Sequence, residues 1–208
     1  KLGLRGEVML HNRVGCRGLG TCMLGCPLGA KQNTRFVSIP KAVDKGARFF
    51  LRARAVRIEA PREEVKRVTV AVLDQHGHHP THTFELRARV VIVAANAIAS
   101  AELLLRSGIG NGHVGRHLIL QPQLAVTALF DEKVRAFDGI PQAYAVTEHE
   151  RDDDPEHGLW GYRIEAVMGT PGNVASVLPL GGTAGKELMA VYDRIAAALV
   201  LVPDEPSG

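Results

Sequence analysis

Three apolar stretches separated by short polar links constrain the fold of this chain more than any other feature. Residues 47–60 and 67–74 alternate apolar and polar side chains, and residues 84–95 end in the continuous apolar run VVIVAA. Alternation with a period of two predicts half-buried strands, and a continuous apolar run predicts a strand buried on both faces. The links PREEVK and QHGHHPTH are rich in charge, Gly, His and Pro, as turns are. We therefore expect a small meander of three strands, the third of them buried.

Two short helices are expected on either side of these strands. PKAVDKGA starts at Pro40 and reaches Gly46, which matches the preference for Pro at the first turn and Gly after the last. SAELLLRSG can be capped by Ser100 and stopped by Gly108, with three leucines as its apolar face. LAVTALFD, at 124–131, is a further expected strand.

The pattern of the sequence changes beyond about residue 131. YAVTE and LWGYRIEAVM are typical of strands, and the acidic stretch HERDDDPEHG between them is typical of a solvated loop. Residues 184–195 predict a helix, and residues 197–204 predict an apolar strand. The expected fold class is mixed α/β, with one domain over 1–130 and a second, sheet-bearing domain over 131–208.

Composition excludes several classes of protein. The 208 residues carry a formal net charge of only +3, and basic residues are not interleaved with stacking aromatics, so nucleic-acid binding is not indicated. No run approaches the roughly 18 apolar residues of a membrane span, and KLGLRGEVML lacks the pattern of a signal peptide. The chain starts without Met and stops at DEPSG, which indicates a piece of a longer protein.

All the cysteines lie in GCRGLGTCMLGCPLGAK, where Cys16, Cys22 and Cys26 have the spacing C-x5-C-x3-C and Pro27 follows. Glycines allow such a loop to curl until several thiolates converge, and Cys-Pro closes many iron–sulfur loops. A three-iron cluster, a four-iron cluster with one foreign ligand, and zinc with His11 as fourth ligand are the metal interpretations. One disulfide plus a free thiol, or three reduced cysteines in a loop, are the alternatives.

The other motifs are weaker indications of a binding or catalytic site. GNGHVG (110–115) matches G-x-G-x-x-G, but it follows an expected helix instead of leaving a strand and opening one, so a glycine-rich loop is expected. His76, His78, His79 and His82 fall in an expected exposed turn. No G-x-S-x-G, H-E-x-x-H or P-loop is present, and no histidine pairs with a nucleophile.

Several stretches, taken in order, resemble the middle of a glucose–methanol–choline (GMC) flavin oxidoreductase. They are the cysteine loop through GAKQNT, then PKAVDKGARFFLRARAVRIEA, VVIVAANAIASAELLLRSGIG and VGRHLILQPQ. The resemblance implies part of a Rossmann-like FAD-binding domain, followed by part of a substrate domain whose sheet roofs the flavin. Enzymes of this family oxidise an alcohol group to a carbonyl and pass hydride to FAD, so a small-molecule alcohol or sugar is the implied substrate.

The resemblance also implies which residues bind the cofactor. Val56 and the turn Ala94, Ala95, Asn96 and Ala97 would lie near the adenosine end of FAD, where small side chains allow backbone groups to approach the nucleotide. Asn96 stands where the family typically has glycine. The pyrophosphate-binding motif would precede Lys1 and the catalytic histidine would follow Gly208, so no catalytic residue is assigned within this chain.

For the cysteines, the resemblance implies a 3Fe–4S cluster, because membrane-associated sugar dehydrogenases of the family carry one on the same spacing and relay electrons to a cytochrome partner. The rival hypotheses are a non-catalytic iron–sulfur or zinc module for electron transfer or structure, and an inactive truncated remnant. Clustered cysteines fit a reducing cytoplasm, whereas the cluster-bearing relatives reside in the bacterial periplasm, so both compartments stay open.

Overall fold

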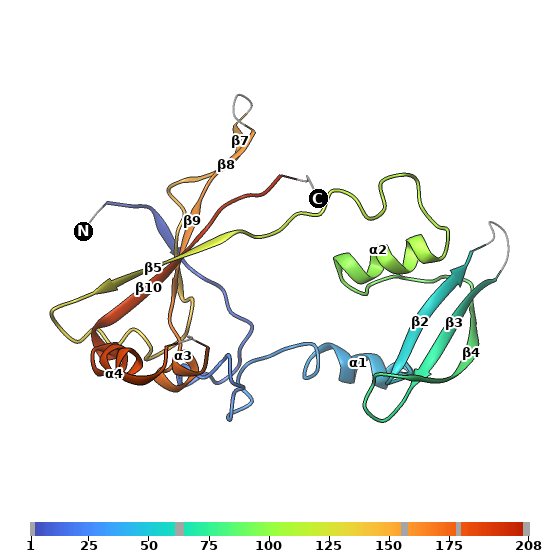
Figure 1. The fold of residues 1–208 in the computed structure, drawn as a ribbon, viewed down its shortest axis with the longest axis horizontal. Helices are drawn as coiled ribbons and strands as arrows, with labels where there is room; N and C mark the ends of the chain where they lie inside the picture. Colours follow the sequence, from blue (N-terminus) through green and yellow to red (C-terminus); the bar gives the residue numbers. More distant parts are fainter. Residues whose placement is uncertain (1–2, 61–64, 155–157, 178–179, 206–208) are drawn as a thin grey trace. The chain divides into compact units, whose positions relative to one another are not determined.

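The computed structural model describes residues 3–60, 65–154, 158–177 and 180–205. The chain divides into two compact units (Figure 1). Unit 1 joins Lys1–Lys45 to Leu120–Asp204, and unit 2 consists mainly of Gly46–Ile119. These units do not follow the sequence-based division at residue 130, because strand β5 (Gln123–Leu129) pairs with a strand close to the C-terminus.

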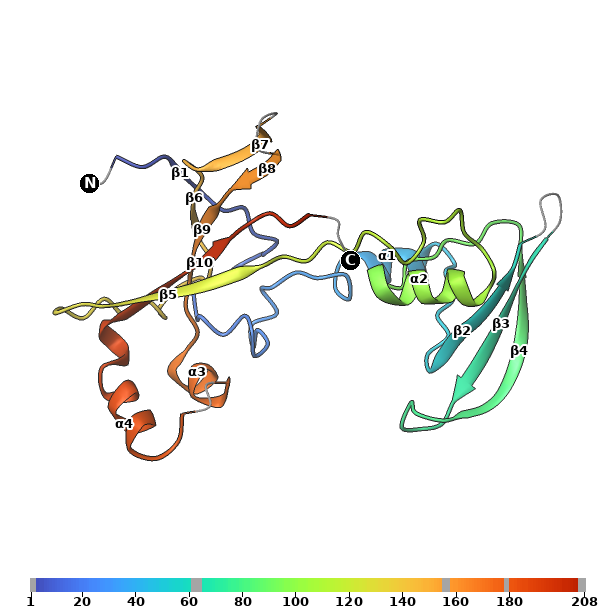
Figure 2. The same ribbon diagram turned by 45° about the horizontal axis from the view of Figure 1, so that its top comes forward.

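Unit 2 contains the meander that the sequence predicts. Strands β2 (Ala53–Glu59), β3 (Lys66–Leu73) and β4 (Pro80–Ala88) form an antiparallel sheet in the order β2-β3-β4. Helix α2 (Ala97–Arg106) lies beside β2 in both ribbon views (Figures 1 and 2). The core is formed by the buried side chains of Ile58, Val68 and Val70, with Val91, Val93 and Leu103 among the residues packed against it.

The expectation of a third strand reaching residue 95 and buried on both faces is wrong. β4 ends at Ala88, and the apolar run after it is extended chain outside any strand. Val91 and Val93 face the core, whereas Val90 and Ile92 are 74% and 85% exposed. A strand buried on both faces needs a layer on each side, and the described part of unit 2 supplies only one.

The start of α2 also differs from the prediction. The helix is capped by Asn96, whose Oδ1 accepts a hydrogen bond from the Ala99 N–H at 3.0 Å, and not by Ser100. The Ser100 hydroxyl instead accepts from the Ala95 N–H at 3.0 Å. At the other end, Ser107 Oγ accepts from the Ile58 N–H at 2.8 Å and donates to the Leu103 carbonyl, so one hydroxyl joins helix to sheet.

Unit 1 is built on a five-stranded antiparallel sheet in the order β1-β6-β9-β10-β5. Its remaining strands are β1 (Gly6–Val8), β6 (Tyr144–Val146), β9 (Arg163–Val167) and β10 (Ile195–Leu201). A separate hairpin pairs β7 (Glu150–Asp154) with β8 (Gly158–Gly161). The acidic stretch predicted as a loop is therefore partly strand, and its residues 155–157 lie outside the described ones.

The helices of unit 1 are short. They are α1 (Ser38–Asp44), α3 (Pro171–Val177), which the sequence did not indicate, and α4 (Gly182–Ala190). The predicted helix over 184–195 stops at Ala190, and a 3-10 turn over Tyr192–Arg194 leads into β10. Among the described residues, no helix is both long enough and apolar enough to span a bilayer.

Candidate functional site

A cavity of about 510 Å³ lies between the start of β2 and helix α2 in unit 2. Its walls bring together two segments that are forty residues apart in the sequence. The lining residues are Arg52, Ala53, Arg54, Ala55, Leu73, Ala95, Ala99, Glu102, Leu103 and Arg106. Four of these ten side chains are alanines, so backbone is exposed to the space between strand and helix.

Val56, a predicted cofactor residue, lies at an irregularity in β2 and follows Ala55, the last residue of this strand that lines the cavity. Ala55 pairs with Val70 and Arg57 pairs with Thr69, so the register passes over Val56. Such a bulge leaves one residue outside the regular ladder and re-aims its side chain, and bulges are common beside active sites. The half-buried Val56 is therefore the residue of β2 that lies outside the regular ladder.

The predicted turn Ala94–Ala97 forms the other side of the site. Asn96 has φ 66° and ψ 174°, a conformation that is essentially reserved for glycine. This is a physical reason for glycine at the equivalent place in the GMC pattern. Of the four predicted residues of the turn, Ala95 lines the cavity, and Ala94, Asn96 and Ala97 adjoin it in sequence.

The cavity carries an excess of positive charge. Arg52, Arg54 and Arg106 contribute cations, and Glu102 forms an i,i+4 ion pair with Arg106. Arg52 also adopts a positive φ of 52°, which is uncommon for a residue with a Cβ. An anionic group is the kind of ligand that such walls favour.

The three cysteines line a second cavity, of about 280 Å³, in unit 1. It is bounded by the loop over residues 11–32 and by residues 140–142. Backbone N–H groups, chiefly that of Lys31 and also those of Leu28, Ala30 and Gly29, lower the pKa of the Cys26 thiol against the opposing effect of desolvation. Cys16 Sγ accepts from the Gly18 N–H at 3.4 Å, and Lys31 Nζ donates to the Cys22 carbonyl at 3.0 Å.

This arrangement does not form a metal site as it stands. All three cysteines are free thiols. Within the described residues, no group of three or more His, Cys, Asp or Glu side chains is placed to hold a metal ion. Cys16, Cys22 and Cys26 line one cavity together with His11, but in the described residues they are not gathered into a group for a three-thiolate cluster or for zinc with His11 as fourth ligand.

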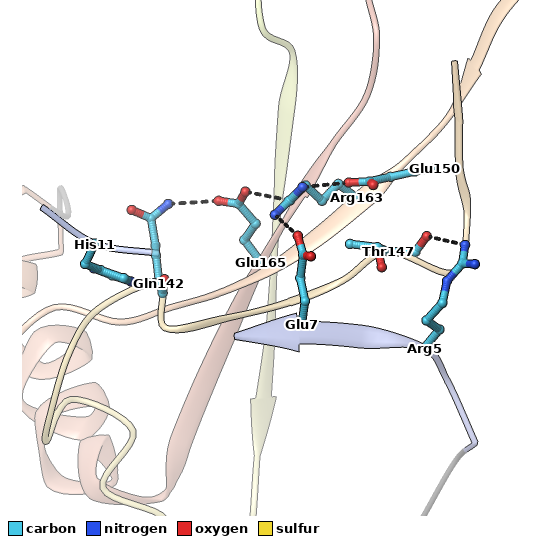
Figure 3. Close-up of polar contacts among 8 residues, drawn as sticks. All are labelled: Arg5, Glu7, His11, Gln142, Thr147, Glu150, Arg163 and Glu165. Atoms are coloured by element: carbon cyan, nitrogen blue, oxygen red, sulfur yellow. Dashed lines mark hydrogen bonds and ion pairs between the residues drawn. The ribbon is translucent and has the colours of Figure 1, made fainter. Parts of the chain in front are cut away.

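Figure 3 shows a polar network that no motif predicted, and two of its residues, His11 and Gln142, line the cysteine cavity. Glu165 on β9 is 8% exposed, and its Oε2 accepts from Gln142 Nε2 at 3.2 Å. Arg163 Nε lies 3.0 Å from Glu165 Oε1 as an ion pair outside hydrogen-bond geometry. Gln142, with φ 54°, also places its carbonyl 3.1 Å from His11 Nε2. The network thus extends from the sheet to one wall of the cavity.

Arg163 is the centre of this network. Its guanidinium also bonds Glu150 at 2.8 Å and Glu7 at 3.2 Å, so it joins β1, β7 and β9. Burial alone would lower the pKa of Arg163, but the hydrogen bond and charge of Glu150, together with Glu165 and Glu7, outweigh it and raise the pKa. The only sequence signal was the carboxylate of Glu165 inside an apolar strand. Its partner Gln142 is 23 residues away, and the Arg163 beside it reaches Glu7, which is 156 residues away.

The glycine-rich motif and the four clustered histidines lie in a loop and around an exposed turn, as predicted from the sequence. GNGHVG follows α2 and is succeeded by extended chain, so it opens no helix among the described residues. His76, His78, His79 and His82 are exposed around the β3–β4 turn. The backbone N–H of His78, together with those of neighbouring turn residues, lowers the pKa of Asp74.

Comparison with known proteins assigns the family. A family model described as GMC oxidoreductase matches residues 1–123. An uncharacterised GMC-type oxidoreductase of Mycobacterium tuberculosis is 34% identical over the whole chain, which spans 31% of that relative. Another, of Sinorhizobium fredii, is 36% identical over 71% of the chain and 28% of its own length. A long-chain-alcohol oxidase of Arabidopsis thaliana is 30% identical over the whole chain and 29% of its own length. The chain therefore belongs to the GMC oxidoreductase family.

Proposed function

We propose that the protein is an FAD-dependent oxidoreductase that oxidises an alcohol group to a carbonyl. Membership of the family implies oxidoreductase activity and FAD binding. The observation that best supports a role for this region is the β2–α2 cavity, because both segments that the resemblance assigns to the adenosine end of FAD adjoin it. The activity itself is proposed for the whole protein, since the chain spans less than a third of its relatives.

Each part of the cavity has a task in this proposal. The chemistry that bound FAD would supply is acceptance of the hydride from the alcohol carbon. The bulge at Val56 offers backbone groups to the adenine ring, as a strand irregularity can. Ala95 and Ala99 keep the wall thin enough for the nucleotide to contact backbone, and the arginines favour its negative charge.

Among the two substrate classes, the relatives favour an alcohol over a sugar. Relatives named long-chain-alcohol oxidases match the whole chain, including the sheet of unit 1. A relative named C-glycoside 3-oxidase matches 54% of it. We therefore propose a long-chain alcohol as substrate, bound in part by the domain to which the unit 1 sheet belongs.

An electron-relaying iron–sulfur cluster with a cytochrome acceptor is the second candidate, and its support is the C-x5-C-x3-C spacing. Because the described residues contain no group of three ligands placed for a metal, no step of the reaction is assigned to such a cluster. Iron and acid-labile sulfide analysis of the purified protein tests it, and their absence would remove this candidate while leaving the flavin proposal intact.

The flavin proposal is tested on the whole protein, expressed from its complete coding sequence. Under anaerobic conditions, 1-dodecanol should bleach the flavin absorbance at about 450 nm and yield one equivalent of dodecanal. Glucose serves as the comparison substrate and should bleach it far more slowly. Protein that carries FAD but is bleached by neither compound would contradict the proposal.

A further inference from the structure

Two histidines outside both cavities face each other through their ring nitrogens. His113 Nδ1 lies 3.3 Å from His117 Nε2, and the ring centroids are 5.5 Å apart with the planes tilted by 33°. Both side chains are exposed, and both belong to the glycine-rich loop that follows α2. This loop has no part in the function proposed above.

The backbone of the loop brings the two rings together. The Arg116 N–H donates to the His113 carbonyl at 3.0 Å and closes a turn. The His113 N–H donates to Asn111 Oδ1 at 3.3 Å, which fixes the entry to that turn. His117 then adopts a positive φ of 64°, so residues 113 and 117 project on the same side.

Packing against α2 holds the loop in this shape. Gly115 has φ 80°, and a Cβ at that position would lie 2.8 Å from Leu105 Cδ1. The Ile109 N–H donates to the Leu104 carbonyl at 3.0 Å, and the Ile109 side chain packs on the core of unit 2. The two imidazoles are therefore set close together before any ligand binds.

The separation of the nitrogens is informative. An N–H donor and its acceptor are usually about 2.9–3.0 Å apart, so 3.3 Å is long for a hydrogen bond. Two nitrogens bound at about 2.0–2.1 Å to one tetrahedral ion are about 3.3 Å apart. We infer that His113 Nδ1 and His117 Nε2 form a two-imidazole site for a borderline divalent transition-metal ion such as Zn²⁺.

The chemistry of the donors selects the ion. Imidazole nitrogen suits Zn²⁺, Cu²⁺ and Ni²⁺, whereas Mg²⁺ and Ca²⁺ take oxygen ligands. The two imidazoles supply two ligands, and water would fill the remaining positions of the coordination sphere. Binding requires both facing nitrogens to be unprotonated, so each imidazole carries its proton on its other ring nitrogen when the ion is bound. The bound ion clamps the loop after α2 across the strained His117.

Imidazole ¹⁵N NMR during a Zn²⁺ titration of the 208-residue chain tests the site. His113 Nδ1 and His117 Nε2 should shift together along one saturable curve. In His113→Gln the apparent affinity at His117 should fall by about tenfold or more, because the second ligand of a chelate binds at high effective concentration. Each imidazole is followed by its own resonance, so Zn²⁺ taken up by the cysteines does not obscure the result.

The matched control is His78→Gln. His78 and His79 are a second exposed pair, but their rings meet edge-on at 6.4 Å. This variant should leave the curves of His113 and His117 unchanged, and the amide spectrum of each variant reports that the fold is retained. Equal affinity at His117 with and without His113 would overturn the inference, and so would the absence of any shift at millimolar Zn²⁺.

Discussion

The candidate cofactor residues near the β2–α2 cavity and the three cysteines of the cysteine cavity were both proposed from sequence, and the two regions differ in how their residues are held together. In unit 2, apolar packing of Leu103 against Ile58 and Val68 brings strand and helix together, and the predicted cofactor residues adjoin the space between them. In unit 1, three cysteines within eleven residues share a cavity but form no metal-binding group. Closeness in sequence thus brought the thiols to one cavity without forming a ligand group in the described residues, whereas packing of distant elements formed the β2–α2 cavity.

The difference has a physical cause. Burial of a helix face on a sheet is driven by apolar area and fixes the position of every residue on both elements. The geometry of a loop depends instead on individual φ angles and on hydrogen bonds such as that from Gly18 to Cys16. The β2–α2 cavity should therefore be sensitive to loss of apolar packing, and the cysteine cavity to loss of hydrogen bonds in its loop.

The largest effect is expected from the core that supports the β2–α2 cavity. Ile58 is 4% exposed, and Ile58→Ala should lower the free energy of unfolding of unit 2 by about 3 kcal/mol. Urea unfolding followed by hydrogen exchange of β2 and β3 measures it. Ile92→Ala is the matched control, because Ile92 is 85% exposed and should cost less than about 0.5 kcal/mol. Equal costs would mean that the run after β4 is buried on both sides after all.

The next effect concerns the single hydroxyl between helix and sheet. Ser107→Ala removes the acceptor of the Ile58 N–H, which then lies buried without its partner. We expect a loss of about 1–3 kcal/mol in the free energy of unfolding and faster hydrogen exchange of the Ile58 amide. Ser100→Ala should cost less, since the Ala95 amide that it releases belongs to an exposed residue. An unchanged Ile58 exchange rate would contradict this account of how α2 is attached.

Two substitutions of Asn96 should change the free energy of unfolding in opposite directions. Asn96→Gly relieves the backbone strain and loses only a few tenths of a kcal/mol of capping, so stability should rise by about 1 kcal/mol. Asn96→Ala keeps the strain and loses the cap, so stability should fall by about 1 kcal/mol. Thermal unfolding measures both. A gain with alanine, or a loss with glycine, would show that Asn96 is not strained.

The cysteine cavity yields an effect on reactivity. Because the Lys31 N–H and its neighbours lower the pKa of Cys26, the folded state keeps more thiolate as pH falls. Alkylation of Cys26 by iodoacetamide, followed by mass spectrometry, should therefore reach its half-maximal rate at a lower pH in the folded chain than in urea. Coincident pH profiles for the two states would show that the amides do not stabilise the thiolate.

Sequence patterns were sufficient where a single periodicity decided the structure. Alternation located β2 and β3, and three consecutive leucines located α2. The cap of α2 was assigned to Ser100, because nothing in the sequence shows that Asn96 takes a positive φ. Whether the VVIVAA run continues the strand and is buried on both faces depends on the layers that pack beside it. A local sequence pattern carries no information about those layers. Glu165 and Gln142 meet only through the pairing of β6 with β9, so their contact was not predictable from spacing.

The central claim is that the β2–α2 cavity belongs to the FAD site, and an FAD titration of the ¹⁵N-labelled 208-residue chain tests it most directly. We expect weak binding, with amide shifts concentrated at Val56 and Ala94–Ala97. Ala95→Leu should abolish these shifts by filling the cavity, while Ala47→Leu, at an exposed position of the same unit, should not. Shifts confined to the cysteine cavity, or shifts that Ala95→Leu leaves unchanged, would contradict the claim.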